Sequence, residues 1–387
     1  MFTPYPSLQT LATGLVVAIV GFFSSFPIVL KGLAGVGAGP AEQASGLMAA
    51  AVAMGIAGIG LSLWKRMPIS VAWSTPGVAL LAITAPSEAG FAGAVGAFLF
   101  AGALTVIAGL WRPLGQLAAS IPAPLAQAML AGVLLSLCIV PFQAMAEVPG
   151  TALPIVLTWA VARLFTRLFA VPLAVLMAAL VTAHGAAYQM PEVASVLTEP
   201  VLVMPVFSML DILSIGLPLF IVTMATQNIP GIAVTKSYGF APAPGPLFAT
   251  VGGASILSAP LGAPATCLAA ITAAMCCNEE SDPDPERRYW SAVFAGVFYC
   301  LFGLFAGVIT AFAGMAPPFV LGTVAGIALM GVFASSTAAA LGDAEYREAA
   351  AITFLVTASG ITIFGLAAAV WGLVIGGAFQ VAARWLR

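Results

Sequence analysis

The sequence STPGVALLAITA at residues 74–85 has a second copy in GAPATCLAAITA at residues 262–273. At a constant offset of 188 residues, Pro76 aligns with Pro264 and both copies end in the same four letters, AITA. Such self-similarity, half a chain apart, indicates an internal repeat. The placement of the two copies in the chain therefore decides the fold.

The composition is that of a membrane protein. Of the 387 residues, 61% are hydrophobic and only 7% are charged, whereas soluble domains carry about 25% charged residues. Residues 113–146 contain no charge at all, and this run is long enough to cross the roughly 30 Å hydrocarbon core of a lipid bilayer. The sequence contains no Walker A motif and no nucleophile or zinc motif, and its five cysteines lack metal-site spacing. We therefore expect no enzyme, no metal or cofactor, and no nucleic-acid partner.

Charged residues and Pro/Gly clusters divide the chain into fourteen apolar segments. These are 8–30, 42–63, 68–86, 90–110, 122–141, 151–165, 169–188, 209–230, 243–258, 260–277, 289–313, 317–338, 348–363 and 366–383. With both termini in the cytoplasm, eleven of the twelve basic residues fall on the inner side, as the positive-inside rule favours. They are Lys65, Arg66, Arg112, Arg163, Arg167, Lys236, Arg287, Arg288, Arg347, Arg384 and Arg387, and only Lys31 lies outside.

The repeated phrase predicts an inverted architecture. Its first copy lies in the third segment and its second in the tenth, so the two cross the membrane in opposite directions. Because they are seven segments apart, we predict an all-α integral membrane protein of fourteen spans, built as a 7+7 inverted-topology repeat. Many secondary transporters have this architecture.

Both copies are predicted to be broken helices. The alternation before Pro76 favours a short extended stretch, Pro76 suits the start of a half-helix, and Ser74 or Thr75 suits its N-cap. In the second copy a half-helix is expected to restart at Pro264. The two half-helix N-termini would then face each other, and their unpaired N–H groups and positive dipole ends suit an anion.

Polar and aromatic residues elsewhere in apolar segments are candidate ligand contacts. Gln227 and Asn228 are expected to donate hydrogen bonds to a carboxylate or a ring heteroatom, or alternatively to join neighbouring helices. Ser24 and Ser25 stand beside Phe26, so hydroxyl donors and an aromatic wall, or ordinary aromatic packing, would occur there. The full set of predicted binding residues is Ser24, Ser25, Phe26, Trp73, Ser74, Thr75, Gly77, Gln227, Asn228, Ala265, Thr266 and Cys267.

No acidic residue is predicted in the middle of a span, which limits how protons could be coupled to transport. The candidates are Asp211 and Glu42 at segment ends, the single histidine His184, and the carboxyl group of the substrate itself. A lone histidine at the end of a span could equally have a structural role.

Six phrases, in order, resemble those of the bacterial benzoate/proton symporters, the BenE family. They are FFSSFPIVLKGL, AWSTPGVALLA, TQNIPGIAV, LAAITAA, DPERRYWSAVFAGVFY and REAAAITFLVTASG. The resemblance implies the fold shared by nucleobase and sulfate-type anion transporters. It implies a core domain of residues 8–112 and 206–315 and a gate domain of residues 113–205 and 316–387.

The resemblance further implies proton-coupled uptake of benzoate or a related aromatic carboxylate across the bacterial cytoplasmic membrane. Many carriers of this fold move the core against the gate and form homodimers through the gate. Nucleobase carriers of this fold have glutamates at the positions of Gln227 and Ala270, so their absence here weakens a nucleobase assignment. Where the family has an asparagine, this chain has Cys267 after an unusual Pro264-Ala265-Thr266, so the substrate could be a relative of benzoate. Two further functions stay open at this point, the carriage of an inorganic anion and passive conduction by a channel.

Overall fold

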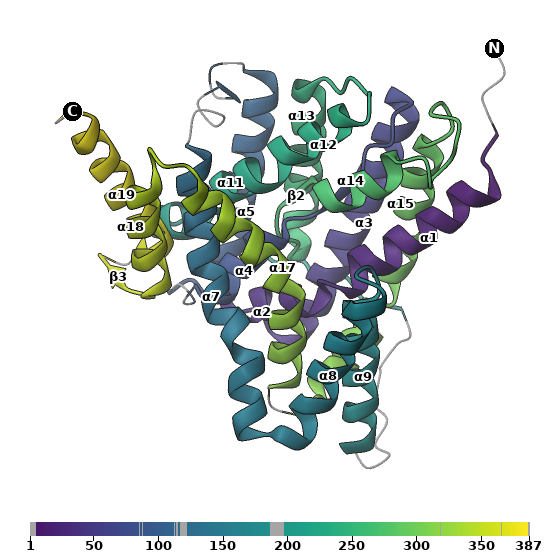
Figure 1. The fold of residues 1–387 in the computed structure, drawn as a ribbon, viewed down its shortest axis with the longest axis horizontal. Coiled ribbons are helices and arrows are strands. Elements are labelled where there is room, and N and C mark those ends of the chain that lie inside the picture. Colours follow the sequence, from purple (N-terminus) through teal and green to yellow (C-terminus); the bar gives the residue numbers. More distant parts are fainter. Residues whose placement is uncertain are drawn as a thin grey trace.

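Apolar helices make up nearly all of the computed structural model (Figure 1), which describes residues 5–84, 86, 88–111, 113, 115–116, 122–185, 197–317, 319–364 and 366–385. Within this part of the chain, seven helices are long and apolar enough to span a membrane. A helix pair bent by 54° raises this number to eight. The predicted helical membrane protein is thus confirmed. Arg112, Arg387 and residues 186–188 of the predicted seventh segment lie outside the described residues.

The elements follow the predicted segments closely. The first half of the chain contains α1 (Leu8–Phe23), α2 (Phe26–Gly35), α3 (Pro40–Lys65), β1 (Val71–Trp73), α4 (Thr75–Ala82), α5 (Gly90–Leu110), α7 (Ala123–Glu147), α8 (Pro149–Phe165) and α9 (Ala170–Gly185). The second half begins with one long helix made of α10 (Met209–Asp211), the π-helical turn η1 (Ile212–Gly216), α11 (Leu217–Thr223), the π-helical turn η2 (Met224–Asn228) and α12 (Ile229–Ser237). It continues with α13 (Pro244–Ser258), the 3₁₀ turn η3 (Ala259–Leu261), β2 (Thr266–Leu268), α14 (Ala270–Cys277), α15 (Tyr289–Leu304), α16 (Ala306–Gly314), α17 (Val320–Gly342), α18 (Arg347–Ala358), β3 (Thr362–Ile363), β4 (Leu366–Ala367) and α19 (Ala368–Trp385).

Two short strands meet at the centre of the molecule. β1 and β2 pair in antiparallel fashion, with Val71 opposite Leu268 and Trp73 opposite Thr266. Each strand leads into a helix of eight residues, α4 or α14. Non-helical backbone is tolerable inside a membrane protein when its N–H and C=O groups are paired within the protein, and this strand pair provides that pairing. A short extended stretch followed by a half-helix is therefore present in both copies, as predicted.

The predicted register of the repeat is wrong. β2 and α14 begin 195 residues after β1 and α4 (Val71 to Thr266, Thr75 to Ala270), and not 188. Pro264 does not start a helix, because Gly262 has a φ of +87° and the chain stays extended through Pro264 to β2. The AITA of the second copy forms the first turn of α14, whereas the AITA of the first copy begins in the last residue of α4.

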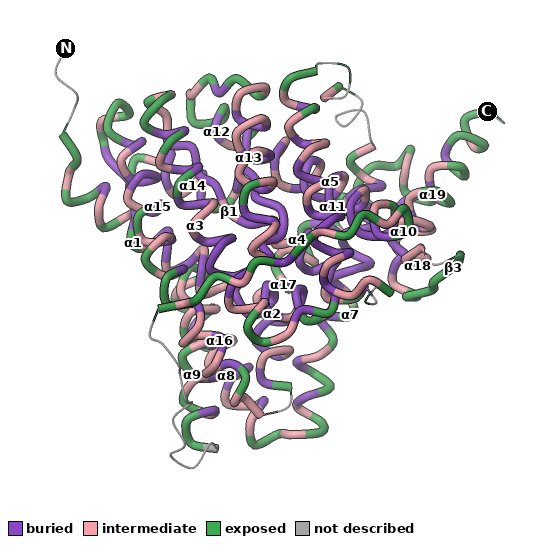
Figure 2. The backbone as a smooth tube through the Cα atoms, turned by 180° about the vertical axis from the view of Figure 1, so that it is seen from behind, coloured by how far each residue is buried: buried purple, intermediate pink, exposed green. Residues whose placement is uncertain are grey.

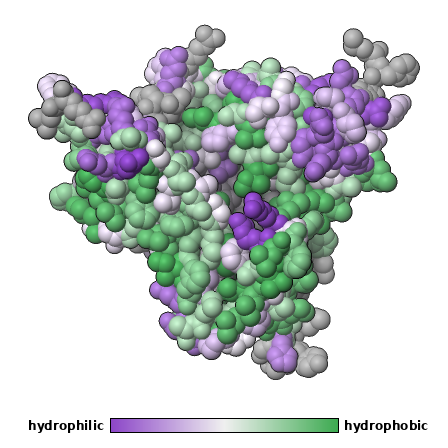
Figure 3. All heavy atoms as spheres, in the orientation of Figure 1, coloured by the Kyte–Doolittle hydropathy of each residue, from purple (hydrophilic) through white to green (hydrophobic). Residues whose placement is uncertain are grey.

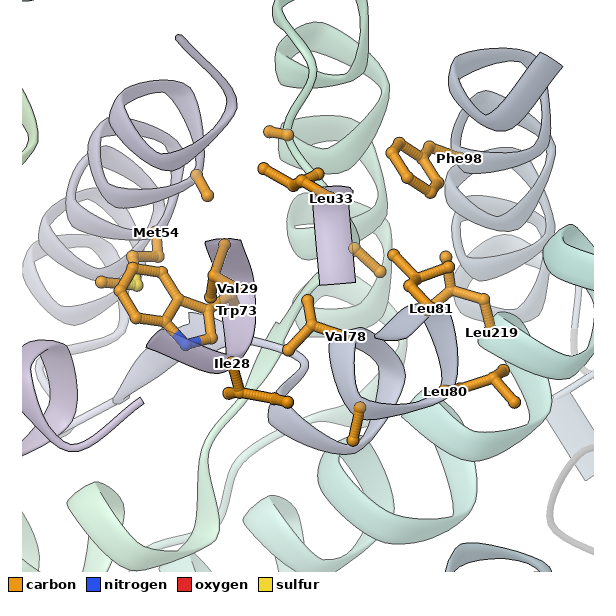
Figure 4. Close-up of a cluster of buried hydrophobic side chains, with 14 of the residues drawn as sticks. Ile28, Val29, Leu33, Met54, Trp73, Val78, Leu80, Leu81, Phe98 and Leu219 are labelled. Atoms are coloured by element: carbon orange, nitrogen blue, oxygen red, sulfur yellow. The ribbon is translucent and has the colours of Figure 1, made fainter. Parts of the chain in front are cut away.

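The half-helix α4 lies in the main hydrophobic core. Leu80 and Leu81 of α4 pack beside Leu219 and Phe98, while Trp73 lies near Met54 (Figure 4). The tube in Figure 2 is accordingly buried around β1, α4 and α11 and more exposed at the periphery. In the space-filling view, apolar side chains form a broad middle band and hydrophilic ones gather toward one rim, as expected for a membrane protein (Figure 3).

The helices α7 and α17 pack against each other beside the half-helices. To one side of this pair lie α18 and α19, and to the other lie α8 and α9 (Figure 1). α17 also packs on α2, and α7 on α4. Surfaces of both sequence halves therefore meet around the strand pair, which positions the site described next.

Candidate functional site

A cavity of about 310 Å³ opens where the half-helices meet α1, α7, η2 and α17. Its lining is Val20, Gly21, Ser24, Ser25, Ala72, Trp73, Thr75, Pro76, Gln127, Leu130, Thr226, Gln227, Pro230, Ala269, Ala270, Ile271, Thr272, Ala328, Leu329, Val332, Ser335 and Ser336. We call it the central cavity. Its volume lies at the lower end of the range of small-molecule sites, about 300–1,000 Å³.

The N-termini of both half-helices reach the central cavity, but they are capped differently. At α4, the Ser74 Oγ accepts a hydrogen bond of 3.2 Å from the Gly77 N–H. At α14, the N-cap residue is Ala269, whose side chain cannot accept one. The first N–H groups of a helix have no partner within the helix. The first turn of α14 therefore presents its N–H groups, and the positive end of its dipole, to whatever occupies the cavity.

The break between α1 and α2 provides the hydroxyl side of the cavity. Pro27 stands at the second position of α2, where its missing N–H ends the hydrogen-bond pattern of α1. The Ser24 Oγ donates to the Val20 carbonyl, and the Ser25 Oγ donates to the Gly21 carbonyl at 2.8 Å. The Ser25 Oγ also accepts a 3.0 Å bond from the Trp73 Nε1, which fixes the indole ring at the cavity wall.

The π-helical turn η2 contributes Gln227 and Thr226. Single π-turns inside α-helices frequently occur at functional sites, and Pro230 follows directly, with no N–H to donate. The Thr226 Oγ1 donates to the Val222 carbonyl at 2.7 Å. No hydrogen bond of the Gln227 amide occurs within the described residues, so this amide can bond to a ligand.

Other predicted residues lie behind the cavity wall and hold the strands. The Asn228 Oδ1 accepts the Leu268 N–H at 2.9 Å, and the Thr266 N–H donates to the Ser255 Oγ at 2.8 Å. Ser74 receives a 2.8 Å bond from the Thr223 hydroxyl, while its own N–H donates to the Ala265 carbonyl at 2.8 Å. These residues position the backbone and do not line the cavity.

Three further residues that were predicted to bind the ligand do not line the central cavity. Cys267 is fully buried and is not among the residues that line the central cavity. Gly77 lies against Leu219, and a Cβ built on it would be 2.5 Å from the Leu219 Cδ1. Phe26 lines a different, apolar crevice. The aromatic contact of the central cavity is therefore Trp73 alone among the predicted rings.

The three candidates for proton coupling lie outside the central cavity. The Glu42 Oε2 accepts the Gly39 N–H at 2.7 Å and caps α3. His184 is exposed in the last turn of α9. Asp211 is only 2% exposed, and its Oδ2 has no hydrogen-bond partner within the described residues.

Sequence reasoning missed Gln127 of α7 and Ser335 and Ser336 of α17. Each is a polar residue inside an apolar run, which is the signal that also singled out Gln227. No ionisable side chain occurs among the described residues that line the central cavity. The space thus combines neutral hydrogen-bonding groups and one helix N-terminus with mostly apolar walls, and it can hold a small anion that carries an apolar body.

Comparisons with known proteins agree on one family. The family model of the benzoate membrane transport protein (BenE) matches residues 5–382. The inner membrane protein YdcO of Escherichia coli K12 is 36% identical over 375 residues, which cover 96% of this chain and 95% of that protein. A benzoate membrane transport protein of Acinetobacter baylyi is 30% identical over 333 residues, covering 86% of this chain and 84% of its own.

Solved structures show the fold. The transmembrane domain of the cyanobacterial bicarbonate transporter BicA superposes with a TM-score of 0.60 at 16% identity and covers 97% of this chain and 96% of its own. The anion transporter SLC26A9 gives a TM-score of 0.66 at 13% identity, covering 97% of this chain and 64% of its own.

Proposed function

Because the chain belongs to the benzoate membrane transport protein family, we propose that it takes up benzoate or a related aromatic monocarboxylate by proton symport across the bacterial inner membrane. The observation that carries this proposal is the meeting of two half-helix N-termini in one uncharged, mostly apolar cavity. Each part of a small aromatic acid has a matching surface there.

The carboxylate would bind at the first turn of α14. The N–H groups of Ala270 and Ile271 occupy its first two positions, and the uncapped N-terminus favours negative charge. The Gln227 amide, which lies on the cavity wall, would donate a further hydrogen bond to one of its two oxygens. No lysine or arginine is needed, because several oriented neutral donors can hold one anion.

The ring would lie against the apolar part of the wall. Trp73 provides a fixed aromatic edge, and Leu130, Leu329 and Val332 provide aliphatic contacts. These contacts disfavour sulfate and bicarbonate, which have no apolar part. The positions at which nucleobase carriers have glutamates, Gln227 and Ala270, both face the cavity and carry no charge, which disfavours a nucleobase.

We further propose the fourteen-span inverted topology with both termini in the cytoplasm. The elements divide into fourteen units if α1 joins α2, each strand joins its half-helix, and α10 to α12 and α15 with α16 each count as one. The central cavity lies near the start of α7 and the end of α17, which are cytoplasmic ends in this topology. The chain would then be in an inward-facing state, with the core (8–112 and 206–315) and gate (113–205 and 316–387) separating on that side. The homodimer implied by the resemblance stays a prediction.

Among the proton-carrying candidates, Asp211 has the most support. Its side chain is buried, and the Oδ2 of its carboxyl group has no hydrogen-bond partner within the described residues. Glu42 already serves as a helix cap, and His184 is exposed.

The test is uptake of labelled benzoate into proteoliposomes with and without an inward proton gradient. Saturable, gradient-dependent accumulation that is blocked by unlabelled benzoate and salicylate, and not by uracil or sulfate, would support the proposal. Uptake without saturation would indicate a channel. Accumulation of uracil or sulfate in place of benzoate would leave the fold intact and overturn the substrate.

A further inference from the structure

A second cavity has the size and lining to bind an aromatic ligand. An apolar crevice of about 450 Å³ lies between α2, α9, α16 and α17. Three phenylalanine rings line it, those of Phe23, Phe26 and Phe312, together with Pro27, Leu321 and Val324. We call it the outer crevice. The predicted aromatic wall around Phe26 thus exists, but in this outer crevice and not in the central cavity.

Lys31 of α2 is not itself a lining residue of the outer crevice, but it lies close to two residues that are. Lys31 lies one helical turn after Pro27, on the same face of α2. Its Nζ is 3.7 Å from where a Cβ on Gly322 would lie, and the residue before Gly322, Leu321, lines the crevice. Within the described residues the half-buried Lys31 ammonium has no ion pair and no hydrogen bond. A half-buried ammonium without a partner at the outer end of an apolar helix is a candidate contact for an anion.

The N-terminus of the neighbouring helix α17 also favours an anion at this place. Gly322 belongs to the first turn of α17, and the N-cap residue of α17, Phe319, makes no side-chain capping bond. A helix N-terminus carries a partial positive charge that repels a cation and attracts an anion. An anion between the Lys31 ammonium and this turn would therefore be favourable to both.

We propose that the outer crevice is a second binding site for an aromatic monocarboxylate, with the ring among the phenylalanines and the carboxylate on Lys31. This inference rests on the proposed function for the choice of ligand. In the proposed topology, the end of α2 and the start of α17 are outer ends. The outer crevice would accordingly be where incoming substrate first binds, before the core and gate expose the central cavity to the outside.

Photolabelling with 4-azidobenzoate tests the proposal on the full chain in phosphatidylcholine nanodiscs. Mass-spectrometric mapping should find adducts on α2 or α17 and separate adducts around α14 and η2. Lys31→Met, which keeps the length and removes the charge, should lower the outer labelling about tenfold, as expected for the loss of one charge-assisted contact. Lys31→Arg should retain it. Lys236→Met removes an exposed lysine at the end of α12 and should change neither set.

Each other outcome is decisive. Outer labelling that persists in Lys31→Met, or labelling of the central cavity alone, would overturn the second site and leave the proposed function standing. Outer labelling that disappears when phosphatidylglycerol replaces phosphatidylcholine would assign the crevice to an anionic lipid headgroup and overturn the proposal. An absence of adducts at both places would overturn the proposed function as well.

Discussion

Gln227 and Asn228 are adjacent amides with different tasks. Gln227 lines the central cavity. The fully buried Asn228 instead accepts the N–H of Leu268, the last residue of β2, and so holds the end of this strand in place. Because adjacent residues of a helical turn point in different directions, one amide can face a ligand while its neighbour supports the wall. The sequence placed both in an apolar segment, and only the structure separates them.

Gln227→Leu tests the cavity-facing amide. The change preserves volume approximately and removes one hydrogen-bond donor to the carboxylate. We expect the Kd for benzoate to rise roughly fivefold to tenfold, which corresponds to about 1 kcal/mol for one hydrogen bond. Isothermal titration of the purified protein measures the Kd, and the thermal unfolding midpoint should stay unchanged. An unchanged Kd would remove Gln227 from the binding site.

Asn228→Leu, unlike Gln227→Leu, should lower the stability of the folded protein. It leaves the buried Leu268 N–H without its 2.9 Å partner, at a cost of about 1–3 kcal/mol. Thermal unfolding in detergent should begin at a clearly lower temperature than for the wild type and for the matched Gln227→Leu variant. If both variants unfold like the wild type, the amide of Asn228 does not support β2.

The two half-helices are similar elements with different ends. α4 is capped by its own Ser74 hydroxyl, while α14 starts after an alanine. Symmetry of the predicted repeat suggested two equivalent walls of one anion site. The structure instead shows a capped α4 and an α14 without a side-chain cap, and in the proposed function the carboxylate binds at α14.

Ala269→Ser would convert α14 into a capped helix. Ala269 has the extended backbone of an N-cap, with φ −107° and ψ 133°, so a serine hydroxyl there could accept the N–H of Ile271 or Thr272. Stability should rise by about 1 kcal/mol, and benzoate affinity should fall several-fold because the hydroxyl competes with the carboxylate. Ala274→Ser, one turn later on α14, makes the same chemical change away from the cap and serves as the control.

Equal or higher benzoate affinity in Ala269→Ser would show that the α14 N-terminus does not hold the carboxylate. The unfolding midpoint gives an internal check on the same samples, because a serine that caps the helix raises it whether or not a ligand binds there.

Much of this element-scale picture could be predicted from the sequence, and the failures have physical reasons. Apolar run length and punctuation by charge located the long apolar helices, since bilayer thickness fixes helix length. The extended stretch and half-helix of the first copy followed from Pro76 and the alternation before it, whereas the half-helix of the second copy begins at Ala270 and not at Pro264. The register failed because AITA is common in an alanine-rich chain and because Pro264 can stand in extended backbone as well as at a helix start. The cavity-facing residues Gln127, Ser335 and Ser336 depend on how distant helices pack, which no local pattern encodes.

At the scale of the whole molecule, the charges and the cavities define two faces. In the proposed topology the basic residues and the opening near Gln127 and Ser335 lie on the cytoplasmic side, while Lys31 and the outer crevice lie toward the outside. Both cavities are lined by α17. Leu321 lines the outer crevice near the start of this helix, and Ser335 lines the central cavity toward its end. A relative movement of core and gate along this helix would open one side as it closes the other, as alternating access requires.

This arrangement predicts the sidedness of two exposed loops. Glu147 ends α7 and is exposed on the proposed outer side, and Glu286 is exposed before α15 on the proposed inner side. A membrane-impermeant maleimide should label Glu147→Cys in intact cells and Glu286→Cys only in inside-out vesicles. Four native cysteines are buried and Cys300 is half-buried, so the unsubstituted chain gives the background. Labelling of Glu286→Cys in intact cells would show that the chain has the opposite topology to the one proposed. The outer crevice and the central cavity would then exchange sides, so the structure would show an outward-facing state and the outer crevice would lie toward the cytoplasm.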